Sequence, residues 1–520
     1  MPEHKGRILW VDDEVELLRP HILHLESRGY ALHTVTNGED AINFVESAEV
    51  DLVLLDESMP GMGGLETLAR LKELRPQLPV VMVTKNEEEA LMEEAIGEKI
   101  NDYLTKPVNP SQILLVVKKF LEAGNIVRNK TAQDYISEFN AVSTALQGPL
   151  DAREWIDVYR KLVEWEIELD RHPELGLHQT MADQRKECNQ EFCKFIERNY
   201  TQWMDGGDVV LSPQVVDNFL LPRLDAPGPV FFLVIDCMRY DQWLVMEQHL
   251  RDMFTVEKDF YFGILPSATP YARNAIFSGY FPSDIERVFP NLWSTGDDDD
   301  YSMNKYEKEF LEKLLERRRV KLRSDLKYIK IIDPEYGKQM VSNISSLVKN
   351  HLTAIVVNFV DMLAHSRSDF PILKEIAPDE SAYRSLTNTW FTHSSLFSMF
   401  KQLARTPNAT IVVTTDHGSV RCLRGSKVLG DRETSTNLRY KYGRNVKADA
   451  RHALHISRPE QYRLPRRGMT TNYIIAKEDF YFVYPTDYNK YLTYYRDSFQ
   501  HGGMSLEELI LPVITLKSRG

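Results

Sequence analysis

The chain has 520 residues, 43% of them hydrophobic and 27% charged, and a formal net charge of −13. This length favours about two to four soluble domains, and the acidic balance excludes the broad basic surface that sequence-independent binding to duplex DNA needs. No apolar run reaches the roughly 18 residues of a membrane span. The N-terminus lacks a secretory signal and the four cysteines form no CxxC pair, so we expect reduced thiols in a cytoplasmic protein.

The first predicted domain, residues 1–122, alternates β-type apolar runs with helical stretches. The runs begin near residues 7, 30, 51, 79 and 102. Five strands that alternate with helices predict a doubly wound, five-stranded parallel sheet. Right-handed crossovers should bring the carboxyl ends of these strands to one edge.

Polar residues stand at those strand ends. Asp12 and Asp13 follow the first strand, Asp56 ends the third, Thr84 ends the fourth, and Lys106 follows the fifth. Three carboxylates in one small site repel one another unless a hard cation joins them, and Mg²⁺ fits this role. A carboxylate can attack a phosphoryl group, with the metal and the lysine offsetting the transferred charge. The pattern therefore predicts an aspartyl-phosphate site.

These residues, together with the loop Asp56–Gly64, resemble a CheY-like response-regulator receiver domain. The resemblance implies that Asp56 is the phospho-acceptor and that the Lys106–Pro107 peptide is cis. The implied site consists of the magnesium ligands Asp12, Asp13 and Asp56 and the switch residues Thr84, Tyr103 and Lys106. The alternative is a degenerate receiver that is never phosphorylated, which the complete set of residues disfavours.

Residues 123–204 form a predicted helical connector. Apolar residues recur at three- and four-residue spacing from Trp155 to Leu169, with Asp151 as a candidate cap. Further helices are expected over residues 132–146 and 179–203, so the three helices predict a small bundle. No basic recognition helix follows, so no direct reading of duplex DNA is expected. The bundle is a candidate lever or dimerisation element.

Residues 205–518 resume the α/β alternation and predict a large α/β domain, opened by Ser212 and Pro213 as a helix cap and first helical residue. Three β-type runs end in acidic or histidine strings, where open α/β sheets place their ligand crevice. With a threonine and a further histidine the candidate donors are Asp236, Thr269, Asp361, His365, Asp416, His417 and His501. Three Asp, three His and one hydroxyl suit two zinc ions with the hydroxyl as nucleophile.

Thr269 lies just before a predicted helix, where the helix dipole and free amides favour a phosphate. Ser267, two residues earlier, is the rival nucleophile. Arg273 and Asn274 follow by one helical turn and are expected either to contact phosphate oxygens or to be surface residues. The donor set predicts in-line attack by Thr269 on phosphorus and a phospho-threonine intermediate.

The strings VxNFxDxxxH, TTDHG and HGGxSxEExxxP together resemble the PglZ branch of the alkaline phosphatase superfamily. The resemblance implies that one zinc is held by Asp236, Thr269, Asp416 and His417, and the other by Asp361, His365 and His501.

The order of receiver, connector and PglZ-type domain resembles a family of response regulators linked to type IX secretion in Bacteroidota. The resemblance implies a zinc-dependent phosphodiesterase that acts on oligonucleotides, including cyclic ones, under the control of Asp56 phosphorylation. A sensor histidine kinase would be the phosphodonor, and phosphorylation would favour a homodimer.

Two other functions stay open. One is a regulatory scaffold whose zinc domain recognises a partner, such as a sigma factor or a sensor kinase. The other is a phosphomonoesterase, although members of that type carry a third metal site and a phosphate-binding arginine that this sequence does not place.

Two charged stretches are ambiguous. Residues 421–447 are rich in Lys, Arg and Tyr, which is typical either of a basic, aromatic wall for nucleotides or of a solvated loop. The acidic run Asp297–Asp300 is expected to open a solvated helix rather than to bind metal.

Overall fold

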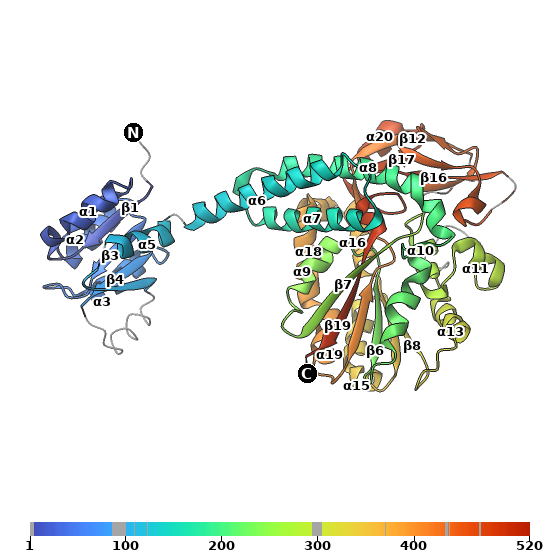
Figure 1. The fold of residues 1–520 in the computed structure, drawn as a ribbon, viewed down its shortest axis with the longest axis horizontal. Coiled ribbons are helices and arrows are strands. Elements are labelled where there is room, and N and C mark those ends of the chain that lie inside the picture. The colour runs from blue at the N-terminus through green and yellow to red at the C-terminus, as the bar shows by residue number, and fades with distance from the viewer. Residues whose placement is uncertain are drawn as a thin grey trace. The chain divides into compact units, whose positions relative to one another are not determined.

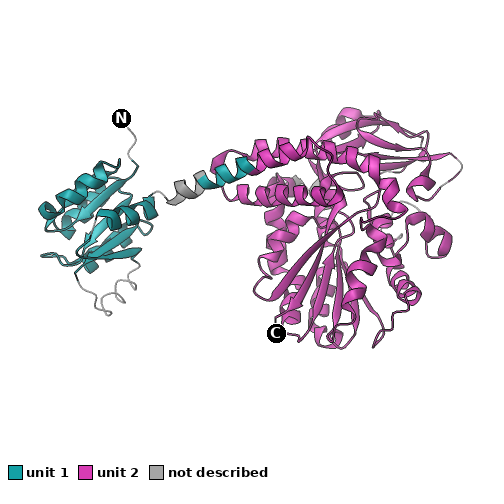
Figure 2. Ribbon diagram, in the orientation of Figure 1, with its two compact units in different colours: residues 1–137 teal, residues 138–520 magenta. Residues whose placement is uncertain are grey.

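The computed structural model describes residues 5–85, 100–108, 110–121, 123–293, 304–369, 371–431, 435, 437–466, 468 and 470–519. The chain forms two compact units, residues 1–137 and 138–520 (Figure 2). Within the described ranges, no helix combines the length and the apolar character needed to cross a membrane.

The first unit contains the predicted five-stranded parallel sheet, with the strand order β2-β1-β3-β4-β5 (Figure 1). Its strands are β1 (Arg7–Val11), β2 (Ala31–Val35), β3 (Leu52–Asp56), β4 (Val80–Thr84) and β5 (Asp102–Thr105). Its helical elements are η1 (Val15–Leu18), α1 (Arg19–Glu26), α2 (Gly38–Ser47), α3 (Gly64–Leu74) and α5 (Pro110–Leu121). The predicted fold class is confirmed for this unit.

The apolar strand β1 explains how both faces of this sheet are covered. Ile8 and Trp10 belong to a core cluster with residues of α1 and α5, whereas Leu9 and Val11 belong to a cluster with residues of α2 and α3. Successive strand side chains point to opposite faces, so a strand that is apolar at every position must be covered on both sides. The carboxyl edge of the sheet is left for polar groups.

Three long helices follow the receiver: α6 (Ala123–Ala145), α7 (Ala152–Asp170) and α8 (His178–Met204), with a short turn η2 (Pro173–Leu175) before α8. Asp151 caps α7 as predicted, because its carboxylate accepts the amides of Arg153 and Glu154 and the Glu154 side chain accepts its own amide in return. α6 begins at Ala123 rather than near residue 132.

The apolar stripes of α7 and α8 pack against each other and against β7, all within the second unit. The rings of Trp155 and Phe192 lie 5.3 Å apart, and Phe192 and Trp203 both contact Phe262, with ring centroids 6.3 and 5.1 Å away. Two buried cysteines, Cys188 and Cys193, lie on α8 as ordinary helical residues with free thiols. From residue 138 onward the connector is therefore part of the same compact unit as the C-terminal domain.

A six-stranded sheet with the order β7-β19-β10-β6-β9-β8 forms the centre of the second unit (Figure 1). Its strands are β6 (Val230–Ile235), β7 (Phe254–Phe262), β8 (Lys327–Ile331), β9 (Leu352–Val357), β10 (Thr410–Thr414) and β19 (Ile510–Ser518). β10, β6, β9 and β8 are parallel neighbours, and β19 is antiparallel to both β10 and β7. β6, β9 and β10 are buried at every position, so helices must cover both faces.

The remaining elements surround this sheet. The helices are α9 (Tyr240–Glu247), α10 (Thr269–Ser278), α11 (Pro282–Val288), α13 (Glu307–Arg317), α14 (Pro334–Ser342), α15 (Ile344–Leu347), α16 (Phe359–Asp369), α17 (Pro371–Ile376), α18 (Glu380–His393), α19 (Ser395–Ala404), α20 (Tyr488–Tyr495) and α21 (Leu506–Leu509). Short helical turns are η3 (Ser212–Gln214), η4 (Val216–Leu220), η5 (Leu221–Arg223) and η6 (Pro459–Tyr462). Ser212 is the first residue of η3 and not its cap; its Oγ accepts the amide of Ile264 at 3.2 Å.

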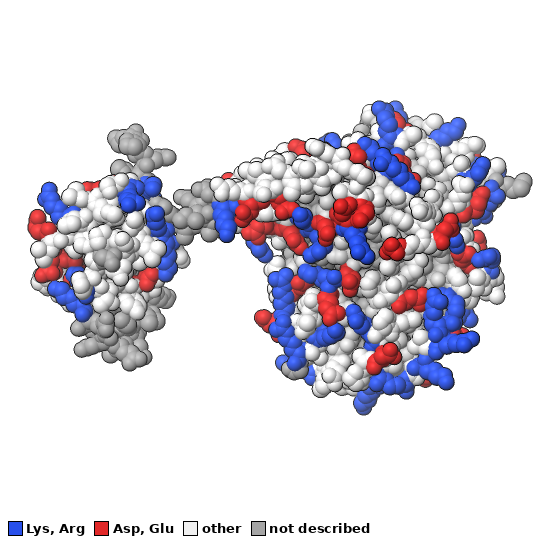
Figure 3. Space-filling view, in the orientation of Figure 1, with Lys and Arg blue, Asp and Glu red and all other residues white. Residues whose placement is uncertain are grey.

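Residues 421–447 are not a solvated loop, as one interpretation of the sequence expected. They contribute to small sheets built from β11 (Val420–Cys422), β12 (Arg424–Leu429), β13 (Tyr440–Arg444), β14 (Lys447–Ala448), β15 (Ala453–Ile456), β16 (Thr471–Ala476), β17 (Phe480–Val483) and β18 (Ser498–Gln500). Two of their arginines pair with acidic residues, the partly buried Arg424 with Asp479 and the buried Arg439 with Glu508, whereas Lys427, Arg444 and Lys447 are exposed. The expected helix at Asp297–Asp300 lies outside the described residues. On the face seen in Figure 3, acidic and basic side chains of the second unit are intermixed.

Candidate functional site

The first acidic site lies at the carboxyl edge of the receiver sheet. Side-chain oxygens of Asp12, Asp13 and Asp56 lie within 4.8 Å of one another. Lys106 Nζ lies 2.8 Å from Asp12 Oδ2 and 2.8 Å from Asp56 Oδ1, and the following Lys106–Pro107 peptide is cis, as predicted. The topology therefore gathers the expected carboxylates around one ammonium group.

One lysine does not balance three carboxylates. Burial raises the pKa of Asp56 by more than the hydrogen bond with Lys106 lowers it, and the neighbouring Asp12 raises it further. An oxygen-only donor set with surplus negative charge fits a hard divalent cation. Of the expected switch residues other than Lys106, Thr84 is buried and donates to Glu57, whereas the Tyr103 side chain is exposed.

The second acidic site lies where β6 and β10 end. These parallel strands pair Val234 with Thr414, so Asp236 and Asp416 stand two residues beyond the same rung of the ladder. Donor atoms of Asp236, Asp416 and His417 lie within 4.8 Å of one another, and all three side chains are buried. We call these three residues the first cluster.

Thr269 faces the first cluster from the first residue of α10. Its Oγ1 lies 2.9 Å from His417 Nε2, and His417 Nδ1 lies 3.1 Å from the carbonyl oxygen of Gly418. A carbonyl oxygen only accepts, so Nδ1 carries the proton and Nε2 presents its lone pair to Thr269 and the carboxylates. This arrangement of a backbone-anchored imidazole is typical of metal-binding histidines.

Arg273 forms ion pairs with both carboxylates of the first cluster. Its Nε donates to Asp416 Oδ2 at 2.9 Å, and its Nη2 pairs with Asp236 Oδ2. Asp236 Oδ1 is left buried, 3.6 Å from His417 Nε2, with no hydrogen-bond partner in the described part of the chain. Burial raises the pKa of Asp236 well above its ordinary value despite Arg273. An unpartnered carboxylate oxygen beside an imidazole lone pair fits a metal cation.

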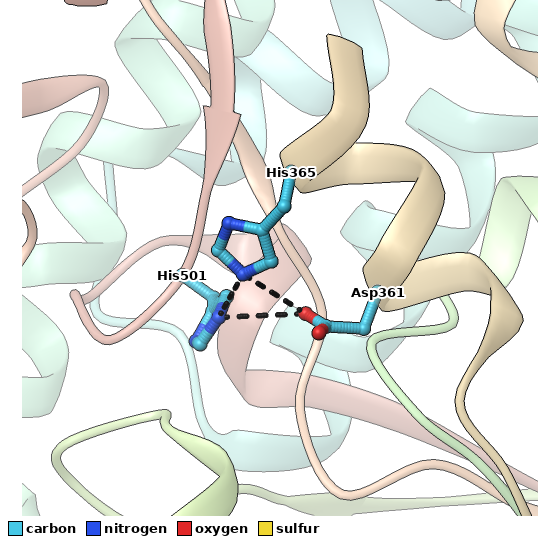
Figure 4. Close-up of side chains that lie close together, drawn as sticks. All are labelled: Asp361, His365 and His501. Carbon is cyan, nitrogen blue, oxygen red and sulfur yellow. Dashed lines mark hydrogen bonds and ion pairs between the residues drawn. The ribbon is translucent and has the colours of Figure 1, made fainter. Parts of the chain in front are cut away.

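The second cluster consists of Asp361, His365 and His501 (Figure 4). Asp361 and His365 are one turn apart on α16, and His501 follows β18. The Nε2 atoms of His365 and His501 lie 3.3 and 3.5 Å from Asp361 Oδ1 and 3.3 Å from each other. The three donor atoms thus point toward one another, which matches the carboxylate and imidazole donors that zinc prefers.

The pKa shifts of the second cluster also favour binding of a cation. Burial lowers the pKa of His501 to about 3, and the nearby His417 adds to the effect. For Asp361, burial alone would raise the pKa, but His365 and then His501 hold it below its ordinary value. Metal-free protein therefore keeps a neutral His501 beside an ionised Asp361, which are the protonation states that bind a cation.

The two clusters adjoin each other. The rings of His417 and His501 are stacked, with centroids 4.2 Å apart and an interplanar angle of 19°. All seven sequence-predicted donors are thus brought together: three follow the strands β6 and β10, three lie on the helices α10 and α16, and His501 lies in the loop after β18. Their two groups, with Thr269 on the first, correspond to the division that the sequence resemblance implied.

The other sequence candidates have different surroundings from those expected. Arg273 and Asn274 are both buried, so the surface alternative is wrong. Asn274 Nδ2 donates to Pro270 O at 2.9 Å, within its own helix. Ser267 is buried against the backbone after His501, with its Oγ 2.8 Å from Gly503 O, whereas Thr269 Oγ1 faces His417. The geometry therefore favours Thr269 over Ser267 as nucleophile.

Sequence reasoning missed the contacts of α8 with the site loops. Tyr200 OH accepts the amide of Leu265 at 2.8 Å, and Cys193 Sγ lies 3.1 Å from Met504 O. Asn189 Oδ1 accepts the amide of Leu506 at 2.8 Å. The positions 189, 193 and 200 share one face of a helix, a spacing visible in the sequence, but their partners lie 65 to 317 residues away along the chain.

Three family models match the chain in sequence order. They are the response regulator receiver domain at residues 8–118, the PorX response regulator linker domain at residues 125–204 and the BREX system PglZ alkaline phosphatase-like domain at residues 215–516. This order of receiver, linker and PglZ-type domain is the architecture that the sequence resemblance implied. The receiver implies a phosphodonor kinase, and domains of both the receiver and the alkaline phosphatase-like type use divalent metals.

Curated relatives share a segment of receiver length. The chain is 36% identical over 118 residues to the transcriptional regulatory protein ResD of Bacillus subtilis, covering 23% of this chain and 49% of ResD. It is 32% identical over 122 residues to the alkaline phosphatase synthesis transcriptional regulatory protein PhoP of the same organism, covering 23% and 50%. The chain therefore spans about half the length of these curated relatives.

Solved structures match over a similar segment. A CheY-like response regulator receiver domain protein from Methanospirillum hungatei is 30% identical and covers 22% of this chain and 94% of that chain, with a TM-score of 0.22. A two-component response regulator from Clostridium difficile is 25% identical and covers 23% and 98%, with a TM-score of 0.22.

Proposed function

Because the chain belongs to the family of PglZ alkaline phosphatase-like proteins, we propose that it is a response regulator whose output domain is a zinc-dependent phosphodiesterase. The observation that carries the proposal is the pair of adjoining donor clusters with the Thr269 hydroxyl directed into the first of them. A PglZ-type domain suggests a phosphoester hydrolase; the two zinc ions and the diester specificity are our proposal.

The residues fit two zinc ions by their chemistry. We assign the first ion to Asp236, Thr269, Asp416 and His417 and the second to Asp361, His365 and His501. Mixed imidazole and carboxylate donors favour zinc over magnesium. In the receiver, the oxygen-only set of Asp12, Asp13 and Asp56 favours magnesium.

Bound in these clusters, zinc would lower the pKa of the Thr269 hydroxyl and offset charge on the attacking and leaving oxygens. Thr269 Oγ1, once deprotonated, attacks phosphorus while the P–O bond to the leaving alcohol breaks, and the departing oxygen takes up a proton. Water then cleaves the phospho-threonine ester, which restores the Thr269 hydroxyl and releases a phosphomonoester. The amides at the N-terminus of α10 favour the negative phosphoryl group throughout.

The surroundings of Arg273 support a diester over a monoester. Its guanidinium is buried and engaged with Asp236, Asp416 and Glu307, so it is not available to neutralise non-bridging phosphate oxygens. A phosphodiester carries one negative charge and a monoester carries close to two at neutral pH. The site therefore suits the less charged substrate, and we propose short oligonucleotides, including cyclic ones, as the substrate class.

The receiver supplies the control. We propose that a sensor histidine kinase phosphorylates Asp56, that Lys106 and the bound magnesium offset the added charge, and that Thr84 and Tyr103 respond. The modified receiver would favour a homodimer and alter hydrolysis in the output domain. The linker match to PorX regulators supports a role in type IX secretion, with a sigma factor as a further partner. We retain residues 1–122, 123–204 and 205–518 as the proposed functional division.

The test is hydrolysis of bis(4-nitrophenyl) phosphate and of short oligonucleotides by the full chain, with and without acetyl phosphate. We expect Thr269→Ala and zinc chelation each to reduce turnover by about a thousandfold, and 4-nitrophenyl phosphate to be the poorer substrate. Thr389→Ala, on an exposed helical position, should leave turnover unchanged. Retained activity in Thr269→Ala or after chelation would contradict the proposal.

A further inference from the structure

Ser267 forms an unusual connection between two parts of the site. The residue is fully buried, and its Oγ donates to the carbonyl oxygen of Gly503 at 2.8 Å and accepts the amide of Gly502 at 3.1 Å. The Oγ also lies 3.4 Å from Glu508 Oε1, but a serine hydroxyl carries one proton, which the shorter contact with Gly503 O takes. The segment that ends in Thr269 is thus fastened to the backbone directly after His501.

The turn after His501 depends on this fastening. Gly502 has a φ of +106°, and a Cβ on Gly503 would lie 2.3 Å from Arg439, so neither position accepts a larger residue without movement. The amide of Gly503 donates to Glu508 Oε1 at 2.8 Å, and Glu508 is paired with Arg439. Ser267 Oγ accepts the neighbouring amide of Gly502, and this hydrogen bond joins the turn to the segment that carries Thr269.

The hydrogen bonds of Ser267 join the segment that faces the first cluster to a segment of the second. Thr269, two residues after Ser267, faces the first cluster, and His501, one residue before Gly502, belongs to the second. A change in the spacing of these two short segments changes the spacing between the nucleophile and the second cluster. Residues that orient metal ligands from behind typically affect metal affinity or activity by about 10- to 100-fold.

We propose that Ser267 is a positioning residue that sets the place of His501 relative to Thr269 and thereby the zinc affinity of the second cluster. This inference rests on the proposed function of Thr269 and His501. Ser267→Ala leaves the buried amide of Gly502 without an acceptor and removes the side-chain contact that joins the turn after His501 to the segment of Thr269, while Glu508 still holds the amide of Gly503. Asp236, Asp416 and His417 follow β6 and β10 rather than this turn, so we expect the first cluster to keep its affinity.

The experiment is a zinc titration of the full chain against a chromophoric chelator, without substrate, followed by kinetics over a range of zinc concentrations up to saturation. For Ser267→Ala we expect zinc binding to the second cluster to weaken by about 10- to 100-fold, with the first cluster unchanged. The value of kcat should fall with the empty second site and recover in part as zinc is raised. Ser267→Cys, which keeps a weaker donor and acceptor, should be intermediate and covers the case in which the alanine variant does not fold.

Ser212→Ala is the matched control. Ser212 is also fully buried, and it accepts the amide of Ile264 in the same stretch of chain, but it does not contact the turn after His501. We expect both zinc affinities and kcat to stay at wild-type values. Wild-type zinc affinity in both Ser267 variants would overturn the inference.

Two further outcomes are distinguishable. If Ser267→Ala abolishes turnover while both zinc affinities stay intact, Ser267 is the nucleophile and the positioning role is wrong. If the unaltered chain binds no zinc, or if Thr269→Ala stays active, the proposed function itself fails, and Ser267 has no metal site to position.

Discussion

The receiver site and the C-terminal site both gather carboxylates at the carboxyl edge of a parallel sheet, yet they differ in exposure and in donor chemistry. In the receiver, Lys106 contacts the buried Asp12 and Asp56, whereas the third carboxylate, Asp13, is exposed to water. In the C-terminal site Asp236 and Asp416 are buried, and their counter-charge is the buried Arg273. An open, oxygen-only site suits an exchangeable hard cation, whereas a closed site with imidazoles suits a resident metal.

The difference also concerns stability. Water can hydrate the receiver carboxylates if their lysine is lost, because the site is partly open. In the closed site, Arg273 is fixed by Glu307, which accepts hydrogen bonds from Tyr328 and from Lys330 at 3.1 Å. Removing one member of such a buried network leaves charges that neither water nor a partner compensates.

The largest expected effect tests this contrast directly. In metal-free protein, Arg273→Met should lower the free energy of unfolding of the second unit by about 3–5 kcal/mol, because it leaves Asp236, Asp416 and Glu307 buried without their counter-charge. Lys106→Met should cost the receiver less than about 2 kcal/mol. Denaturant unfolding of the full chain, followed separately for each unit, measures both losses.

A matched control is Arg451→Met, because Arg451 pairs with Asp449 on an exposed surface and should contribute no measurable stability. Equal losses for Arg273→Met and Lys106→Met would contradict the distinction between a closed and an open site.

The second effect concerns the connector from residue 138 onward, which belongs to the same compact unit as the C-terminal domain. Asn189→Ala removes the acceptor for the buried amide of Leu506 and the donor to Glu507, so we expect a loss of about 1–3 kcal/mol from the second unit. Asn199→Ala, on the same helix, loses only a bond to Phe195 O of its own helix and should cost about 0.5 kcal/mol or less.

Calorimetry of the full chain provides the measurement. The connector and the C-terminal domain should unfold in one transition that Asn189→Ala shifts and Asn199→Ala leaves nearly in place. A separate connector transition, unaffected by Asn189→Ala, would show that the helices are an independent unit.

The smallest expected effect is on the pH dependence of stability in metal-free protein, which should have opposite signs in the two units. Burial raises the pKa of Asp56, so its contribution to receiver stability is present below the ordinary pKa and is lost as pH rises through the raised value. Burial lowers the pKa of His501 to about 3, so the unfolded chain takes up that proton first and the second unit loses stability as pH falls below about 6.5.

Thermal unfolding between about pH 4 and pH 7 should therefore show slopes of opposite sign for these two contributions. Asp56→Asn should raise receiver stability most at neutral pH, and His501→Gln should flatten the acid side of the second unit. The 5-fluorotryptophan resonance of Trp10 reports the receiver, since Trp10 is its single tryptophan. Unchanged slopes in both variants would show that these groups do not carry the dependence.

Much of the fold and of the donor set is predictable from the sequence because the carboxyl ends of parallel strands converge by topology. Asp236, Asp416 and His417 follow apolar runs directly, and the i, i+4 spacing of Asp361 and His365 places them on one helix face. The strings therefore identify a site before any contact is known.

The contacts that support these donors are less predictable, because they join segments without a shared spacing. In the sequence, Arg273 is an ordinary helical arginine, and only the structure shows its ion pairs with Asp236 and Asp416. Likewise, the sequence makes Ser267 a candidate nucleophile, and only the structure shows that its hydroxyl is hydrogen-bonded to Gly502 and Gly503. The sequence left residues 421–447 open between a nucleotide-binding wall and a solvated loop for the same reason, since the acidic partners of Arg424 and Arg439 lie some 50 or more residues away.

The most direct test of the account is an anomalous difference map, recorded at the zinc edge, from crystals of the full chain grown with zinc. The account predicts two peaks in the second unit, one contacting Asp236, Thr269, Asp416 and His417 and one contacting Asp361, His365 and His501. Zinc bound elsewhere, or no peak between these side chains, would contradict it.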